Sequence, residues 1–350
     1  MSAGPLERRY RRLLWAYPRT YRRRHGAEIL TTLLAMAEPG QSRPAAADAV
    51  DLIRGGLRQR FRLPVGRPVL ILAAVLCAVI GGAFGAAAGS WAGVQTFADL
   101  PDEAALSVIA DRAAAGGAEQ ARSRDGSPWY GESAARHYTV PPSWDAAAAG
   151  RALAAQGWRV GPVSDPGGAA WQQNEDGTQT RLSMRGGDFR AERDGLLLQV
   201  RGFVVAEQNG SVSVVVWPRV TAVFLPLIAA GALLGLVAGW LVAAALLRRH
   251  AARAPAGLRL AARVLTGAAL LMLALPAWAL YANMVRAFRH AGADGLVFTV
   301  HSAFTAGRWF PFGPSTLVLV LTLGGLLTGA VAAVLAAIAR PAPRAQDVTA

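Results

Sequence analysis

The chain has 350 residues, of which 53% are hydrophobic and only 17% are charged, against about 25% charged residues in an ordinary soluble protein. Its formal net charge is +14, and all 36 basic residues are arginine. Without lysine, neither a phosphate-binding loop ending in Gly-Lys-Ser/Thr nor a lysine Schiff base can form. A single cysteine, Cys77, excludes an intrachain disulfide and a cysteine zinc cluster.

Residues 1–67 are expected to form a small helical region. Five residues on one face predict a first helix that Pro18 ends: Leu6, Tyr10, Leu13, Leu14 and Tyr17. A second helix is expected from about Glu28 to Met36. A third starts near Pro44 and aligns four apolar residues: Val50, Ile53, Leu57 and Phe61. Three short amphipathic helices can bury one another or lie on a membrane.

The same region resembles a known segment. Residues 10–18, Tyr-Arg-Arg-Leu-Leu-Trp-Ala-Tyr-Pro, and 21–26, Tyr-Arg-Arg-Arg-His-Gly, followed by Glu28, are similar to the N-terminal prefix of certain bacterial permease-type membrane proteins. The prefix also occurs in uncharacterised multi-pass membrane proteins of actinobacteria. The resemblance covers about residues 8–60 and implies a non-catalytic segment linked to transcriptional regulators of the PadR type. Transport is not implied, because the rest of the chain departs from a large permease.

Four stretches without Asp, Glu, Arg or His each supply the roughly 20 apolar residues that a spanning helix needs. They are Pro68–Ala98, Val220–Leu247, Val264–Val285 and Trp309–Ala339. Buried helices of soluble proteins rarely reach this length without a polar face. We therefore predict an α-helical membrane protein with four transmembrane helices, at 68–91, 218–247, 264–285 and 313–339. The lack of ionisable residues within the four stretches argues against an ion-coupled carrier.

Arginine placement predicts the orientation. Residues 1–67, the loop 248–263 and the tail 340–350 together carry 21 Arg and six acids, whereas the rest of the chain carries 15 Arg and 16 acids. By the positive-inside rule, both termini are cytoplasmic in a bacterial cell (inner) membrane. Residues 92–217 and the loop 286–312 are then extracytoplasmic.

Anionic lipid headgroups are the expected partner of the arginine-rich N-terminus, at about 1 kcal/mol for each arginine near the surface. The arginines expected to anchor it to the membrane surface are Arg8, Arg9, Arg11, Arg12, Arg22, Arg23 and Arg24. Nucleic acid is not an expected partner, because no recognition motif accompanies these charges.

Residues 92–217 are expected to form an α+β domain. Helices are predicted at Glu103–Ala115 and Trp144–Gln156, against an antiparallel sheet of three or four strands in which Asp194-Gly195 turns a hairpin. His137 is the only histidine of this segment, and neither a Gly-x-Ser-x-Gly elbow nor a His-Glu-x-x-His pair occurs. No catalytic residue, cofactor or metal is therefore predicted.

Two alternatives remain open on the extracytoplasmic side. Four tryptophans serve either as core and interface anchors or as a sugar-stacking surface: Trp129, Trp144, Trp158 and Trp171. In the outer loop, His290 and His301 are either interfacial residues or a metal-binding pair.

Glycines spaced by four residues predict close helix packing in the membrane. The first span carries Gly81, Gly85 and Gly89, the second Gly231, Gly235 and Gly239, and the fourth Gly325 and Gly329. Because the spacing places each set on one helix face, it predicts close contact with another helix but does not identify that helix.

The chain is expected to have one folded region on each side of the membrane and no ionisable residue inside the four predicted transmembrane helices. This arrangement favours a non-enzymatic signalling or accessory protein. Its outer domain would sense or bind a ligand, and its N-terminal region would engage a cytoplasmic regulator. A subunit of a transport (permease) complex is the main alternative, and a membrane-anchored enzyme with its site in the outer domain is the second. The sequence leaves a homo-oligomer open.

Overall fold

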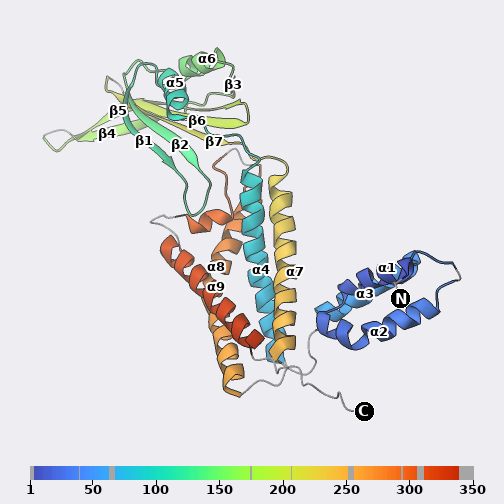
Figure 1. Cartoon of the computed structure of the whole chain (residues 1–350). Helices are drawn as coiled ribbons and strands as arrows, with labels where there is room; N and C mark the ends of the chain where they lie inside the picture. Colours follow the sequence, from blue (N-terminus) through green and yellow to red (C-terminus); the bar gives the residue numbers. More distant parts are fainter. Residues whose placement is uncertain are drawn as a thin grey trace. The chain divides into compact units, whose positions relative to one another are not determined.

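A computed structural model describes residues 4–38, 40–62, 68–173, 176–205, 207–250, 256–292, 295–305 and 311–338 (Figure 1). The expected tail 340–350, the middle of the expected loop 248–263, and Trp309 lie outside the described residues. The chain divides into two compact units. Unit 1 comprises Met1–Gly82, Leu234–Leu273 and Gly324–Ala350, and unit 2 comprises Ala83–Leu233 and Ala274–Leu323.

The N-terminal helices belong to unit 1. They are α1 (Pro5–Leu13), the 3₁₀ turn η1 (Leu14–Ala16), α2 (Arg19–Ala35) and α3 (Ala46–Phe61). Proline at the first helical position favours the start of α1, because the amide it lacks would be unpaired there anyway. Leu6, Tyr10, Leu14 and Leu52 are buried together, so the three helices share a small core.

The second helix was predicted to begin near Glu28, and this is wrong. It begins at Arg19, directly after Pro18, because the basic cluster is itself helical. Arginine favours helices, and the ring of Tyr21 stacks on that of Tyr17 and contacts the tilted ring of His25 four residues further along α2.

Four helices among the described residues are long and apolar enough to span a membrane. They are α4 (Pro68–Val94), α7 (Phe224–His250), α8 (Ala256–Arg289) and α9 (Ser315–Ile338). The predicted number of long apolar helices is confirmed. Helix α8 extends beyond the predicted stretch Val264–Val285 at both ends, because arginines near a helix end do not break it and complement its dipole in the last turn.

Unit 2 contains a sheet domain, residues 103–218. Its helices are α5 (Glu103–Ala114) and α6 (Ala146–Ala154). Its strands are β1 (Ala118–Asp125), β2 (Ser133–Val140), β3 (Arg159–Val160), β4 (Gly168–Gln173), β5 (Gln179–Arg193), β6 (Leu196–Val205) and β7 (Gly210–Pro218). The strands form one antiparallel sheet in the order β1-β2-β7-β6-β5-β3, and β4 pairs with β5.

The prediction of three or four strands is wrong, since the sheet has seven. Strand β1 is exposed along its whole length, and its Arg-, Glu- and Ser-rich sequence lacks the apolar alternation that marks a half-buried strand. The predicted hairpin turn is confirmed. Asp194 and Gly195 both have positive φ, at 49° and 78°, and join β5 to β6.

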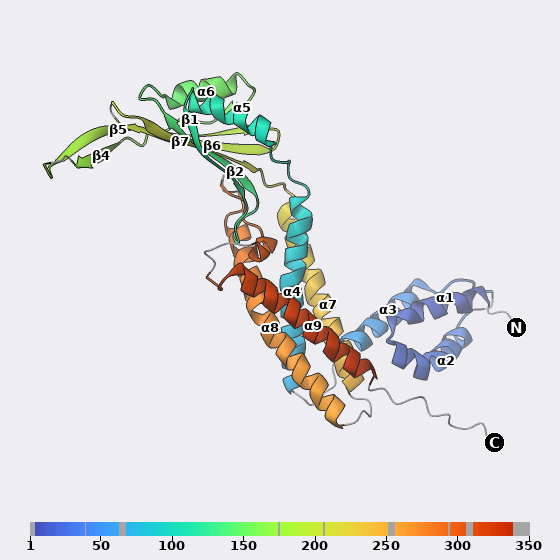
Figure 2. The same ribbon diagram turned by 60° about the vertical axis from the view of Figure 1, so that its left-hand side comes forward.

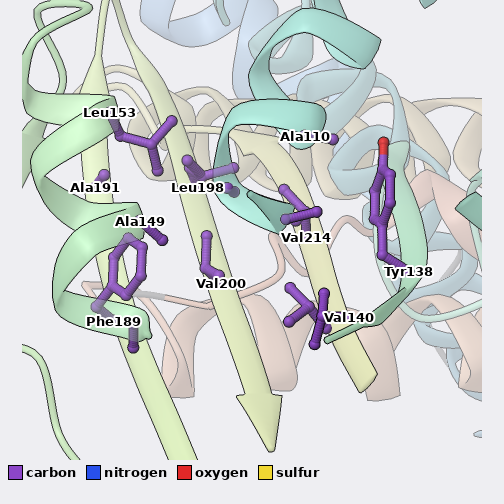
Figure 3. Packing of buried hydrophobic residues seen from close by; sticks show 14 of the residues in the cluster. Ala110, Tyr138, Val140, Ala149, Leu153, Phe189, Ala191, Leu198, Val200 and Val214 are labelled. Atoms are coloured by element: carbon purple, nitrogen blue, oxygen red, sulfur yellow. The ribbon is translucent and has the colours of Figure 1, made fainter. Parts of the chain in front are cut away.

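Both helices of the sheet domain lie on one face of the sheet, as two views show (Figure 1; Figure 2). The core lies between the helices and the sheet (Figure 3). Alternate strand residues pack there against Leu153 of α6, among them Phe189, Leu198, Val200 and Val214. Strands β2, β5, β6 and β7 therefore each turn one set of side chains toward the helices. Asp102 and Asp145 accept hydrogen bonds at the N-termini of α5 and α6, respectively, and fix where these helices begin.

The buried guanidinium of Arg136 links α5 to the sheet through ion pairs. Arg136 of β2, 2% exposed, donates to Glu119 of β1 at 2.7 Å and is ion-paired with Glu103 of α5. The neighbouring hydroxyl of Tyr138 donates to Asp111 of α5 at 2.8 Å. Burial, followed by this hydrogen bond, raises the pKa of Tyr138 well above its usual value.

Candidate functional site: the junction of the sheet domain with α4 and α8

Within unit 2, the loop between β1 and β2 pairs with the segment that follows α8. Tyr130 and Phe298 form an antiparallel bridge. The amide of Gly131 donates to the carbonyl of Val297 at 2.9 Å, and the amide of Thr299 donates to the carbonyl of Trp129 at 3.3 Å. The sheet domain is thus joined by backbone pairing to the segment after α8, in addition to its covalent connections to α4 and α7.

Asn283 of α8 lies fully buried at the centre of this junction. Its side-chain amide donates to the carbonyl of Pro128 at 2.7 Å, and the carbonyl of Thr299 and the hydroxyl of Ser302 each lie 3.3 Å away. The hydroxyl of Ser302 donates to the carbonyl of Thr299 at 2.6 Å, and the carbonyl of Pro128 lies 3.2 Å from the same hydroxyl. One helix side chain therefore holds the β1–β2 loop and the segment after α8 at the same point.

Ser90 of α4 makes a second polar contact with that segment. Its hydroxyl accepts from the amide of Val300 at 3.0 Å and lies 3.0 Å from Nδ1 of His301. Burial lowers the pKa of His301 and so favours the neutral imidazole. Because the hydroxyl of Ser90 already accepts from an amide, its own proton is free to be donated to an unprotonated Nδ1.

An aromatic contact lies one turn beyond Asn283. The guanidinium of Arg286 lies over the ring of Trp129 at 3.4 Å from the centroid, a cation–π contact. The ring of Phe312 makes a T-shaped contact with the ring of Trp129, with centroids 6.5 Å apart. Asn283 and Arg286, three residues apart on α8, thus hold the same loop from one helix face.

The predicted site residues did not include Asn283, although one signal was available. It is a polar amide inside the predicted apolar stretch Val264–Val285, and such residues in spans usually face protein rather than lipid. Its partner Pro128 lies 155 residues away, and neither Pro128 nor Thr299 stands at a recognisable spacing from it.

The glycine sets of the first two spans lie together. A Cβ added at Gly81 would lie 3.1 Å from the Cα of Gly239 and against the carbonyl of Gly235. A Cβ added at Gly231 would lie 3.1 Å from the Cα of Gly89 and against the carbonyl of Gly85. Within each unit, α4 and α7 therefore approach to backbone contact, at a spacing that only glycine permits.

The glycines of the fourth span face α8 instead. A Cβ at Gly325 would lie 2.6 Å from Cγ of Leu273, which is too close, whereas one at Gly329 would lie an ordinary 3.7 Å from Cβ of Ala269. Of these two positions, only 325 therefore requires glycine, because a larger residue there would clash with Leu273.

The predicted anchor arginines divide into two groups. Five are exposed: Arg8, Arg11, Arg12, Arg23 and Arg24. The other two are half-buried and used within the N-terminal helices. Arg9 donates to the carbonyl of Ser42 at 3.0 Å, and Arg22 lies over the ring of Trp15.

The four tryptophans do not form one surface. Trp144 and Trp158 belong to the core of the sheet domain, Trp129 lies at the junction, and Trp171 is exposed on β4. His137 is exposed on β2.

The other candidate metal or catalytic groups have local partners. Nδ1 of His290 lies 3.0 Å from the carbonyl oxygen of Arg286, and its ring contacts that of Phe298, while His301 contacts Ser90. Among the described residues, no group of three His, Cys, Asp or Glu side chains could hold a metal ion.

Two cavities on the sheet domain could take a ligand. One, of about 620 Å³, has charged walls that include Arg159, Asp188, Arg190 and Glu192. The other, of about 570 Å³, has largely apolar walls from α5 and the start of β6, including Val108, Ile109 and Leu196. Both sizes suit a small ligand.

No known protein family, curated protein or solved structure matches the chain.

Proposed function

We propose that the chain is a non-enzymatic multi-pass protein of a bacterial cell membrane, of the signalling or accessory kind. The sheet domain binds a ligand outside the cell, and the N-terminal helices engage a regulator in the cytoplasm. The arginine distribution supports this orientation, since arginine-rich segments stay on the cytoplasmic side. The five exposed N-terminal arginines suit anionic headgroups at the same side.

The observation that carries the proposal is the junction at Asn283. A ligand that displaces the β1–β2 loop must strain the bonds from Asn283 to Pro128 and from Gly131 to Val297. Because Asn283 belongs to α8, that strain acts on a helix long enough to cross the membrane. A ligand can shift such a helix only by binding its two arrangements unequally, and the junction provides the required physical connection.

Crosslinking and pull-down from native membranes test the function. Recovery of a soluble transcriptional regulator through the N-terminal helices supports the signalling role. Recovery of an ATPase instead supports the transport-complex alternative and contradicts the proposal.

Amide exchange of the full chain tests the junction. The Asn283→Ala variant should exchange faster at Gly131 and Thr299, whose amides pair the two segments. Thr266→Ala is the matched control, because Thr266 also lies on α8 but its hydroxyl donates to the carbonyl of Ala262 in its own helix. Equal exchange in both variants would remove the proposed connection.

A hydrolase screen tests the absence of catalysis. The purified full chain should turn over none of a broad set of ester, peptide, glycoside and phosphate substrates. Turnover that His137→Ala abolishes would establish the enzyme alternative.

A further inference from the structure

Helix α3 has two different apolar faces. One packs on the other N-terminal helices. Leu52 is buried there, and a Cβ at Gly56 would lie 2.7 Å from the backbone of Ala16. The other face carries Val50, Ile53, Leu57 and Phe61, which we call the α3 stripe, with exposed fractions of 61, 42, 45 and 36%.

The α3 stripe is a continuous surface rather than four separate exposures. At about 100° per residue its members fall within about 80° of the helix circumference, roughly opposite Leu52. They extend about 16 Å along the axis at 1.5 Å per residue. The core of the N-terminal helices is complete without them, since it includes none of the four. Scattered apolar residues on a surface are ordinary, whereas a contiguous strip indicates a contact.

Positive charge borders the stripe. Arg54 and Arg58 are exposed and follow its edge at four-residue spacing, and Arg62 continues the row. Of the two acids of α3, Asp48 is turned toward the core, where it accepts a hydrogen bond from Tyr10 at 3.3 Å. Asp51 is exposed on the same side as the arginines but lies further from the stripe than Arg54 and Arg58. An apolar face with arginines at its edge is the pattern of helices that lie in the surface of an anionic bilayer.

A hydrogen bond ties the end of the stripe to a candidate span. The carbonyl of Phe61 accepts from the indole nitrogen of Trp240 in α7 at 3.1 Å. Trp240 lies about 24 Å along the axis from Phe224, near the far boundary of a hydrocarbon core about 30 Å thick. Tryptophan favours that boundary, and α4 begins soon after α3, at Pro68.

We infer that α3 is an interfacial helix. Its stripe inserts among the lipids of the leaflet at the Trp240 end of α7, and Arg54 and Arg58 contact anionic headgroups there. The inference rests on the proposed insertion of the four long helices into a membrane. It adds a defined lipid-facing surface to the N-terminal region.

Spin-label accessibility of the full chain tests this inference. In a Cys77→Ala background, a nitroxide is placed by Leu57→Cys on the stripe or by Asp51→Cys, an exposed position of the same helix outside the stripe. In phosphatidylglycerol nanodiscs, the label at 57 should collide more with oxygen than with a water-soluble nickel chelate, and the label at 51 should show the reverse. Adding Arg54→Gln and Arg58→Gln, or using phosphatidylcholine, should raise the nickel collisions at 57 several-fold.

Two results would overturn the inference. Dominant nickel collisions at 57 would place the stripe in water, and low collisions with both reagents would place it against protein, either a second copy or a partner. A third label at Leu271→Cys, an exposed position of α8, separates this failure from that of the membrane proposal. Oxygen collisions at 271 without any at 57 would contradict only the inference about α3, whereas nickel collisions at both would contradict membrane insertion itself.

Discussion

Arg136 is a single residue whose role follows from its burial. A guanidinium that is 2% exposed keeps its charge at a high desolvation cost unless acids compensate it, and Glu103 and Glu119 do so from α5 and β1. The sequence presents Arg136 as one of 36 arginines, and only its position between helix and sheet distinguishes it.

Removing both acids should destabilise the sheet domain. Glu103→Gln combined with Glu119→Gln leaves the buried charge uncompensated, and we expect a loss of about 3 kcal/mol in the free energy of unfolding. Urea unfolding of the full chain in detergent measures it. Glu132→Gln is the control, because its pair with Arg124 is exposed and should contribute less than about 1 kcal/mol. Equal losses in the two cases would contradict the role of Arg136.

The burial of Tyr138 predicts that the free energy of unfolding depends on pH. Its pKa is raised in the folded chain by burial and by the bond to Asp111, whereas in the unfolded chain the phenol releases its proton near pH 10. The stabilisation is therefore complete below about pH 10 and is lost as the pH rises above that value. Stability measured between pH 9 and 12 should fall more steeply for the native chain than for Tyr138→Phe. Parallel curves would show that Tyr138 does not contribute.

The paired helices α4 and α7 show how small residues set a helix interface. Without side chains at Gly81 and Gly231, carbonyl oxygens of the facing helix occupy the space where a Cβ would stand. Lipid tails are as apolar as leucine, so close van der Waals packing rather than hydrophobic burial holds such helices together.

Cysteine crosslinking tests the register of this interface. In a Cys77→Ala background, cysteines at 89 and 231 should crosslink within one chain. A pair at 81 and 231 should crosslink poorly, because 81 lies about 12 Å further along the helix. Crosslinks that run between chains would assign the glycines to an oligomer instead.

A substitution series tests the same contact energetically. Gly85→Leu should lower stability in detergent, because it forces the backbones apart. Leu76→Ile, a volume-conserving change on the same helix, should cost less than about 1.5 kcal/mol. The packing role fails if both variants are equally stable.

For the whole molecule, the proposed orientation has a direct test. A reporter that is active only outside the cytoplasm should work when fused after Gly150 and should fail when fused at Arg253 or after Ala350. The expectation follows from the excess of arginine in the segments assigned to the inside. Activity at Arg253 would reverse the orientation and, with it, the cytoplasmic role of the N-terminal helices.

Several features could be predicted from local sequence. The four long helices follow from uninterrupted apolar runs, and the β5–β6 turn follows from Asp194-Gly195. Strands β1 and β4 could not be predicted in the same way, since one is exposed throughout and the other pairs only with the outer part of β5. Their pairing depends on a partner strand rather than on an apolar pattern of their own.

The number of long apolar helices, the charge asymmetry and the folded polar segment could all be read from the amino-acid sequence, because each depends on composition over neighbouring residues. The pairs of helices that meet through glycine, the burial of Arg136 and the link that Asn283 makes between the β1–β2 loop and the segment after α8 are visible only in the folded chain. Pro128 lies 155 residues from Asn283 and Thr299 lies 16 residues from it, and no sequence period relates them. They meet because buried polar groups must find partners wherever the fold brings a donor and an acceptor together.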